Sequence, residues 1–212
     1  MFYLYIFFLK IYIMSIILGK DNNNNYRYLS VDNEGILWDK LRYRRSLGQC
    51  FSTVYDISLT TSTTKAILSI FNTSSTDNIY IYSINVKIVS AATSGMSTCN
   101  IYKLTTNPNP ISPTIIYGSN LKLGESDSTV SNIKSDISSS DYTTNGLLYT
   151  QMLQATLSGT DVENAFILNL YDEMIELQQN TGILIEIDNQ TNVTIKGVAN
   201  VKFMEINNNE IL

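Results

Sequence analysis

Carboxylates are the side chains with the clearest potential for chemistry, because the sequence contains no histidine. Histidine is the commonest general base and the commonest metal ligand of proteins. Asp172, Glu173 and Glu176 lie close together in an apolar segment. A pair of such carboxylates could serve as the acid and the base of a glycosidase. Nothing singles out two of them, however, and a turn between strands explains the acids, so we expect no catalytic residues.

Four further acids lie within residues 105–145 and could bind Ca²⁺ as oxygen ligands: Glu125, Asp127, Asp136 and Asp141. Their spacing does not fit an EF-hand loop, so we interpret them as solvated loop charge. The sequence also contains no Gly-rich phosphate loop and no GxSxG or HExxH motif. We therefore predict neither a metal nor a cofactor.

Cys50 and Cys99 are the only cysteines. A zinc site built from cysteine alone needs about four ligands, which one chain cannot supply. Two cysteines also do not make a disulfide framework. The simplest interpretation is two small buried apolar side chains, and pairing stays open in case their strands are neighbours.

Alternating apolar and polar residues indicate β-strands over most of the chain after residue 48. The clearest strand is IYIYSINVKIV at 79–89, which predicts that Tyr80, Tyr82, Ile84, Val86 and Ile88 share a buried face. The pattern predicts no helix of ordinary length. Residues 164–178 have strand-like composition, with a helix as the alternative.

Residues 182–188 and 191–206 both alternate, and the pair resembles a hairpin with Asn189 and Gln190 as its turn. Gly197 and Ala199 fall in the middle of the second segment. Small residues inside a strand indicate a bend or the close approach of another strand.

The stretch 105–145 is long and polar, and it holds all three prolines of the chain. Long irregular loops are uncommon inside compact domains and are often functional. The alternative is a set of short edge strands, at 114–117 and 130–133, joined by polar links.

Eight to ten alternating strands, with only 16% charged residues, predict an all-β fold: a two-sheet antiparallel β-sandwich, jelly-roll-like in architecture. We divide the chain into a hydrophobic leader (1–18), an N-terminal arm (19–47), the β-sandwich domain (48–206) and a polar tail (207–212). The net charge of −5 argues against specific nucleic-acid binding by the main body.

The leader has three open interpretations. The apolar stretch 2–18 is shorter than the roughly 20 residues of a membrane span, and Lys10 interrupts it. It also lacks the leading basic residues of a signal peptide. Residues 2–13 contain only amino acids that A/T-only codons encode, which favours a misassigned start with Met14 as the true one. A real anchor or signal, or a packed N-terminal strand, are the alternatives, and only an anchor would bring contact with a membrane.

The segment 35–45, GILWDKLRYRR, concentrates cations beside aromatic residues. It is either a solvated segment that packs Trp38 and Leu41 onto the domain, or a basic arm that contacts a neighbouring subunit or an acidic surface. On the second interpretation, the candidate partner contacts are Trp38, Lys40, Arg42, Tyr43, Arg44 and Arg45.

GKDNNNNYRYLSVDNEGIL, at residues 19–37, resembles a leader found in structural proteins of tailed phages and large DNA viruses. In those proteins a pattern of G-K-D, N-x-x-Y and L-x-V-D-x-x-G-x-L precedes a β-rich domain. The resemblance covers about one tenth of the chain. It implies a virion-associated β-sandwich protein of the decoration, minor capsid or fibre-associated type, with no enzymatic activity and no catalytic residues to transfer.

We therefore expect a non-enzymatic protein located in a virion and made in the host cytoplasm. Its expected partners are further copies of itself, as a homo-oligomer, and/or a major capsid protein, which residues 35–45 and the stretch 105–145 would contact. Two alternatives remain: a carbohydrate- or host-surface-binding module on the same fold, and a membrane-anchored surface protein.

Overall fold

The computed structural model describes residues 47–90, 95–109, 114–128, 131–155, 165–170 and 174–209. Residues 19–46 of the arm fall outside these ranges, and Gly48–Leu212 forms one compact unit. Its regular elements, within the described ranges, are β1 (Cys50–Leu59), β2 (Thr63–Asn72), β3 (Asp77–Ser90), β4 (Gly95–Leu104), β5 (Thr114–Ile116), β6 (Ser119–Asn120), β7 (Ser131–Ile137), the 3-10 helix η1 (Ser139–Asp141), β8 (Thr144–Ala155), β9 (Ala165–Asn169), β10 (Ile175–Leu177), β11 (Thr181–Asn189) and β12 (Ile195–Asn207).

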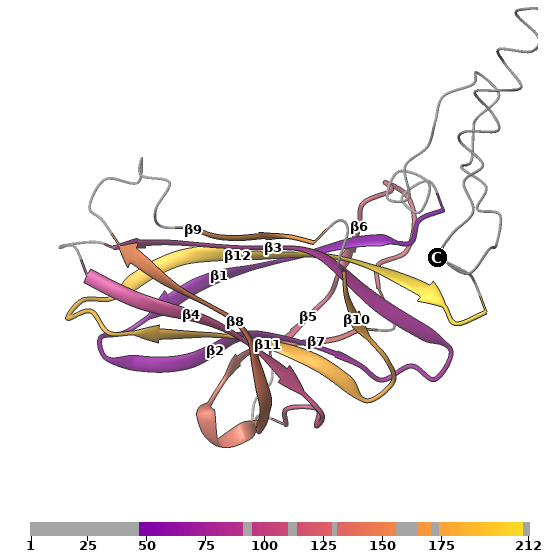
Figure 1. Ribbon diagram of the computed structural model, residues 1–212. Helices are drawn as coiled ribbons and strands as arrows, with labels where there is room; N and C mark the ends of the chain where they lie inside the picture. Colours follow the sequence, from indigo (N-terminus) through magenta and orange to yellow (C-terminus); the bar gives the residue numbers. More distant parts are fainter. Residues whose placement is uncertain are drawn as a thin grey trace, which may run out of the picture. The chain divides into compact units, whose positions relative to one another are not determined.

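The strands form two antiparallel sheets, which lie as two layers in Figure 1. The first sheet has the order β10-β3-β12-β1-β6, and β9 also pairs with β3. The second sheet has the order β5-β7-β2-β11-β4-β8. The predicted all-β, two-sheet antiparallel sandwich is therefore confirmed.

The long strands pair from the ends of the domain inward. β1 pairs with β12, β2 with β11, β3 with β9 and β10, and β4 with β8. Successive pairs alternate between the two sheets. The short strands β5, β6 and β7 come from the chain between β4 and β8, and they extend the sheets beside β2 and β1.

The core lies between the sheets, where every second residue of each long strand points inward. Ile183, Ile185 and Ile187 of β11 face the core from the second sheet, as their spacing predicts. Phe51 of β1 lies opposite Phe203 of β12 in the first sheet, and their rings stack with centroids 5.6 Å apart. This contact anchors the end of the core where the two terminal strands of the domain meet.

The prediction that β11 and β12 form a hairpin is wrong. The two segments alternate as predicted, but β11 lies in the second sheet and β12 in the first. The chain crosses between layers at Asn189, which is fully buried. Its side-chain amide donates hydrogen bonds to the carbonyls of Leu59 (3.3 Å), Thr60 (2.8 Å) and Val193 (3.0 Å). Asn189 thus fixes a corner of the sandwich.

The predicted facing of Tyr80 and Tyr82 is also wrong. Ile79 and Ile81 belong to the core cluster together with Ile84, whereas the two tyrosines do not. The pairing of β3 with β12 shifts register between Lys202 and Phe203, leaving Tyr82 as an extra residue on β3. A bulge of this kind reverses the alternation of the strand on one side of it.

Gly197 confirms the predicted close approach of a second strand. A Cβ atom at this position would lie 2.1 Å from the carbonyl oxygen of Lys87 and 2.9 Å from Cα of Ile88. Both belong to β3, the neighbour of β12. Glycine is therefore required here because β12 and β3 lie too close together to accommodate a side chain at this position.

The stretch 105–145 follows the edge-strand interpretation, because it contains β5, β6, β7 and η1. A second apolar cluster lies on the outer face of the second sheet, since Leu184 points away from the neighbouring core residues of β11. Tyr142, just after η1, packs against this cluster. Residues 165–169 and 175–177 are strands, so the helical alternative for 164–178 does not hold.

Candidate interaction surface

The longest exposed edge in the described part of the molecule belongs to β8. Within the described ranges, this strand of 12 residues ends the second sheet and pairs with β4 alone. It contains no charged residue and no proline. The backbone N–H and C=O groups on the outer side of such a strand are a template for pairing with another strand.

The other sheet edges are blunted by features that prevent strand addition. Very short strands close three of them: β5 and β10 have three residues each, and β6 has two. β9 has five. Where β1 extends past β6, its edge carries the exposed side chain of Asp56. The edge strand β10 likewise carries the exposed Glu176. In β7, Asp136 has a φ of 57°, which interrupts the extended backbone. β8 has no comparable charge or short length.

Exposed apolar side chains gather on β8 and its neighbour β4. Leu147, Leu148 and Met152 are 52%, 41% and 64% exposed, and Met96 on β4 is 44% exposed. Met96 pairs with Gln154 and Thr98 with Met152, so the two methionines are diagonal neighbours on one face. Methionine adapts its shape to irregular surfaces. The surface defined by Met96, Leu147, Leu148 and Met152, called here the β8 edge surface, suits contact with a protein.

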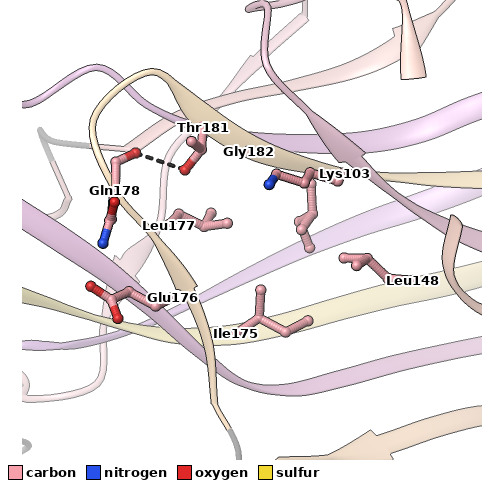
Figure 2. Close-up of a pocket in the computed structure, with 9 residues that line it drawn as sticks. Lys103, Leu148, Ile175, Glu176, Leu177, Gln178, Thr181 and Gly182 are labelled. Atoms are coloured by element: carbon pink, nitrogen blue, oxygen red, sulfur yellow. Dashed lines mark hydrogen bonds between the residues drawn. The ribbon is translucent and has the colours of Figure 1, made fainter. Parts of the chain in front are cut away.

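A cleft of about 350 Å³ lies beside the β8 edge surface, where β10 meets β11, β4 and β8. It is lined by Lys103, Leu148, Ile175, Glu176, Leu177, Gln178, Thr181, Gly182 and Ile183. In Figure 2 the apolar side chains of Leu148, Ile175 and Leu177 share the cleft with Lys103 and Glu176. Its volume is at the lower end of the range for ligand sites. Leu148 belongs to both the cleft and the edge surface.

Glu176 lies at the rim of this cleft, where a neighbouring amide holds its carboxylate. Its Oε1 accepts a hydrogen bond from Nδ2 of Asn78 at 2.8 Å. Opposite it, Thr181 Oγ1 donates to the carbonyl of Gln178 at 2.8 Å, which fixes the turn into β11. Asp172 and Glu173, the other acids of the predicted group, lie outside the described residues. The cleft thus offers one cation and one anion on apolar walls, an arrangement that fits binding.

A cluster of three polar side chains joins the sheets away from the cleft. Tyr55 of β1 and Lys65 of β2 both donate hydrogen bonds to the carboxylate of Asp136 on β7. Burial acts to raise the pKa of Asp136, but the hydrogen bonds from Lys65 and Tyr55 outweigh it and hold this pKa below its usual value. Burial, followed by the Asp136 hydrogen bond, raises the pKa of Tyr55.

A second polar contact covers the outer apolar cluster. The hydroxyl of Tyr142 donates a hydrogen bond to the carboxylate of Glu186 on β11. Burial and then this hydrogen bond raise the pKa of Tyr142. The contact fastens the end of the stretch 105–145 to the sheet, so it has a structural explanation.

The acids predicted in the stretch 105–145 do not converge on one point. Glu125 forms an ion pair with Lys122 at 2.8 Å, and Asp127 accepts a hydrogen bond from the backbone N–H of Asn120 at 3.1 Å. Asp136 is the carboxylate of the Tyr55 cluster. No group of three or more potential metal ligands occurs within the described ranges.

The remaining predicted residues have separate outcomes. Cys50 and Cys99 are buried, form no disulfide, and lie in different sheets. Burial, reinforced by the charge of Glu186, raises the pKa of the Cys99 thiol to about 12. The six candidate contacts of the arm, from Trp38 to Arg45, lie outside the described residues, and so does the leader. Among the residues that the structure describes, no helix is both long and apolar enough to cross a membrane.

The sequence pattern did not single out the β8 edge surface. The place of β8 at the end of a sheet depends on partners more than 40 residues away in the chain, such as Asn100 for Thr150. The available signal was the absence of charge in a long β-rich segment, which is the composition of an unprotected edge.

No protein-family model matches the sequence, and no curated protein matches it. Among solved structures, a subviral particle of VP2 from infectious bursal disease virus is 13% identical with a TM-score of 0.18, over 76% of this chain and 42% of that chain. The structure of the Gt strain of the same virus is 11% identical with a TM-score of 0.18, over 91% and 51%. The chain thus spans about half the length of either match or less, and TM-scores this low transfer neither fold nor function.

Proposed function

We propose that this chain is a non-enzymatic virion structural protein, of the minor capsid, decoration or fibre-associated type. It acts through contacts with further copies of itself and/or a major capsid protein. The proposal combines the resemblance of residues 19–37 to leaders of virion proteins with the architecture of the domain that follows them.

The observation that carries the proposal is the nested pairing of the long strands. The chain pairs β1 with β12, β2 with β11, β3 with β9 and β10, and β4 with β8, and successive pairs alternate between the sheets. This order of pairing is that of a jelly roll. Viral capsid domains use this architecture, as do lectins and cupins. Fold alone does not assign function, so the choice among these classes of protein depends on the surface of the domain.

The described surface favours a protein contact over a small ligand. The β8 edge surface presents four exposed apolar side chains along one edge of the second sheet. Apolar groups of this kind, when contiguous, mark interaction sites. A carbohydrate-binding module is the second candidate, because the adjacent cleft has ligand-site volume and carries Lys103, Glu176 and Gln178. None of the residues that line the described cleft is aromatic, so it lacks a stacking platform for a sugar ring.

Quantitative mass spectrometry of purified particles tests the proposal. We expect the chain to copurify through density gradients at a fixed copy number relative to the major capsid protein. Its loss from washed particles would overturn the virion role. Glycan-array binding by the same protein, abolished by a substitution of Glu176, would instead support the carbohydrate-binding alternative.

A further inference from the structure

We propose that β8 pairs with β8 of a second copy of this chain, antiparallel and about a two-fold axis, so that the two second sheets join into one continuous sheet. This inference rests on the proposed function, since it names the edge through which subunits would meet. The occupant of the edge is a second copy, and the contact is a main-chain hydrogen-bond ladder flanked by the β8 edge surface.

The backbone of β8 provides the first argument. The pairing with β4 is regular from Tyr149 to Ala155, while the register shifts lie nearer the start of the strand, around Tyr102. A regular segment presents its outward N–H and C=O groups at even spacing, as a pairing strand requires. Bulges twist an edge away from pairing, so we place the contact in the second half of β8.

Charge provides the argument for a second copy. A two-fold axis brings each side chain close to the same side chain, or its near neighbours, in the partner. Like charges opposite one another in a sheet are destabilising. β8 carries no charge at all, whereas Asp56 on β1 and Glu176 on β10 would each meet their own kind. Among the described edges, β8 is thus the long one that tolerates self-pairing.

The side chains complete the argument. Met152 and Met96 lie on one face of the second sheet, so two copies would bring four methionines together across the axis. Buried apolar area and the ladder would then act together, as in other complexes formed by strand addition. Thr150 already donates a hydrogen bond to Asn100 at 2.7 Å, so its polar group needs no partner from the second copy.

Cysteine scanning of β8 in the full-length chain tests the geometry. The native thiols of Cys50 and Cys99 are buried, so an exposed engineered cysteine reacts selectively. We make Leu148→Cys, Thr150→Cys and Met152→Cys singly and oxidise them mildly. Covalent dimers should form in highest yield at the position nearest the axis and fall at the others. Val54→Cys, an equally exposed site on β1 (55%), is the matched control and should stay monomeric on denaturing gels.

Sedimentation velocity tests the energetics with a second variant. Met152→Lys places two cations near the axis and should weaken the dimer about tenfold or more, whereas Val54→Lys should not change it. Both sites are exposed, so equal unfolding midpoints serve as the folding control. A full-length chain that stays monomeric at its highest soluble concentration, or a dimer that Met152→Lys leaves unchanged, would overturn the inference.

The two proposals fail separately. If the chain is present in particles but β8 variants associate normally, the virion role stands and the β8 contact falls. If the chain dimerises through β8 but is absent from particles, the β8 contact stands and the virion role falls.

Discussion

The hydroxyl of Tyr55 on β1 donates a hydrogen bond to the carboxylate of Asp136 on β7, and this contact joins the first sheet of the sandwich to the second. Lys65 of β2 donates to the same carboxylate. Asp136 has a φ of 57°, a left-handed conformation that is uncommon for residues other than glycine. Position 136 therefore combines two requirements: a negative charge that accepts both hydrogen bonds, and a residue that tolerates the left-handed conformation.

The first prediction concerns Asp136→Asn. The folded pKa of Asp136 lies below its unfolded value, so the unfolded chain binds the proton first as the pH falls. The stabilisation by this carboxylate is therefore complete above about pH 4, the ordinary range of aspartate, and is lost as the pH falls through the folded pKa. Asparagine tolerates the left-handed backbone. The variant should be less stable at pH 7, and its deficit should vanish in acid.

Denaturant unfolding of both proteins at a series of pH values measures this effect. Asp56→Asn, on the same strand as Tyr55 but exposed, is the matched control and should change the unfolding free energy at pH 7 by less than about 0.5 kcal/mol. A deficit in Asp136→Asn of the same size at pH 7 and in acid would show that the charge is not responsible.

The second prediction concerns the corner at Asn189. The Asn189→Ala variant removes donors to three backbone carbonyls and the acceptor of the Thr191 N–H (3.0 Å). Buried groups left without partners cost about 1–3 kcal/mol each, so we expect a loss of about 2–4 kcal/mol of unfolding free energy. Asn192→Ala, at an exposed site in the same corner, should change it by less than about 0.5 kcal/mol. Equal effects of the two substitutions would contradict the role of Asn189.

The third prediction concerns Gly197→Ala. The added methyl would meet the Lys87 carbonyl at 2.1 Å, and the backbone of β3 cannot move without disturbing its pairing. Overpacking of this kind costs about 1–3 kcal/mol, and we expect the upper part of that range in thermal or denaturant unfolding. Val198→Ala, at the neighbouring outward position, should have a small effect. A neutral Gly197→Ala would mean that the strands lie farther apart than the structure places them.

The fourth prediction concerns the thiols. Cys50 and Cys99 are 2% and 0% exposed, and the pKa of Cys99 is raised to about 12. Because the thiolate is the reactive form, raising the pH to 9 should not speed the modification of Cys99 in the folded protein. A chromogenic disulfide reagent should titrate two thiols per chain only after unfolding. Rapid reaction of either thiol in the native protein would contradict its burial.

Sequence periodicity was sufficient for the fold class and for the inward faces of β11 and β12, because alternation depends on neighbours along one strand. It could not place Tyr82, since the extra residue of the bulge is defined only against β12. It could not separate β11 from β12, because a crossing between sheets and a hairpin turn use the same polar residues around Asn189. In both places the structure depends on which strand lies alongside, and periodicity within one strand does not report this.

The candidate surface was harder to predict than the fold. The basic residues between Trp38 and Arg45 are easily identified in the sequence by their charge. The β8 edge surface, by contrast, lies on a strand that lacks charge. Its significance depends on the other edges being short or charged, which only the sheet order reveals. Glu176 is a candidate in the sequence because other acids lie near it in the chain. In the structure it is instead a polar residue at the rim of a cleft that has largely apolar walls.

The nested pairing has a consequence during translation. β1 leaves the ribosome first, yet its long partner is β12, whose residues are the last of the domain to be made. Until then this ten-residue strand, half of whose residues are buried in the folded domain, lacks that partner, and contacts so distant in sequence form slowly. A premature stop before residue 195 would therefore remove the central strand of the first sheet and leave an insoluble fragment, and synthesis of the intact chain would make heavy use of chaperones that hold exposed strands.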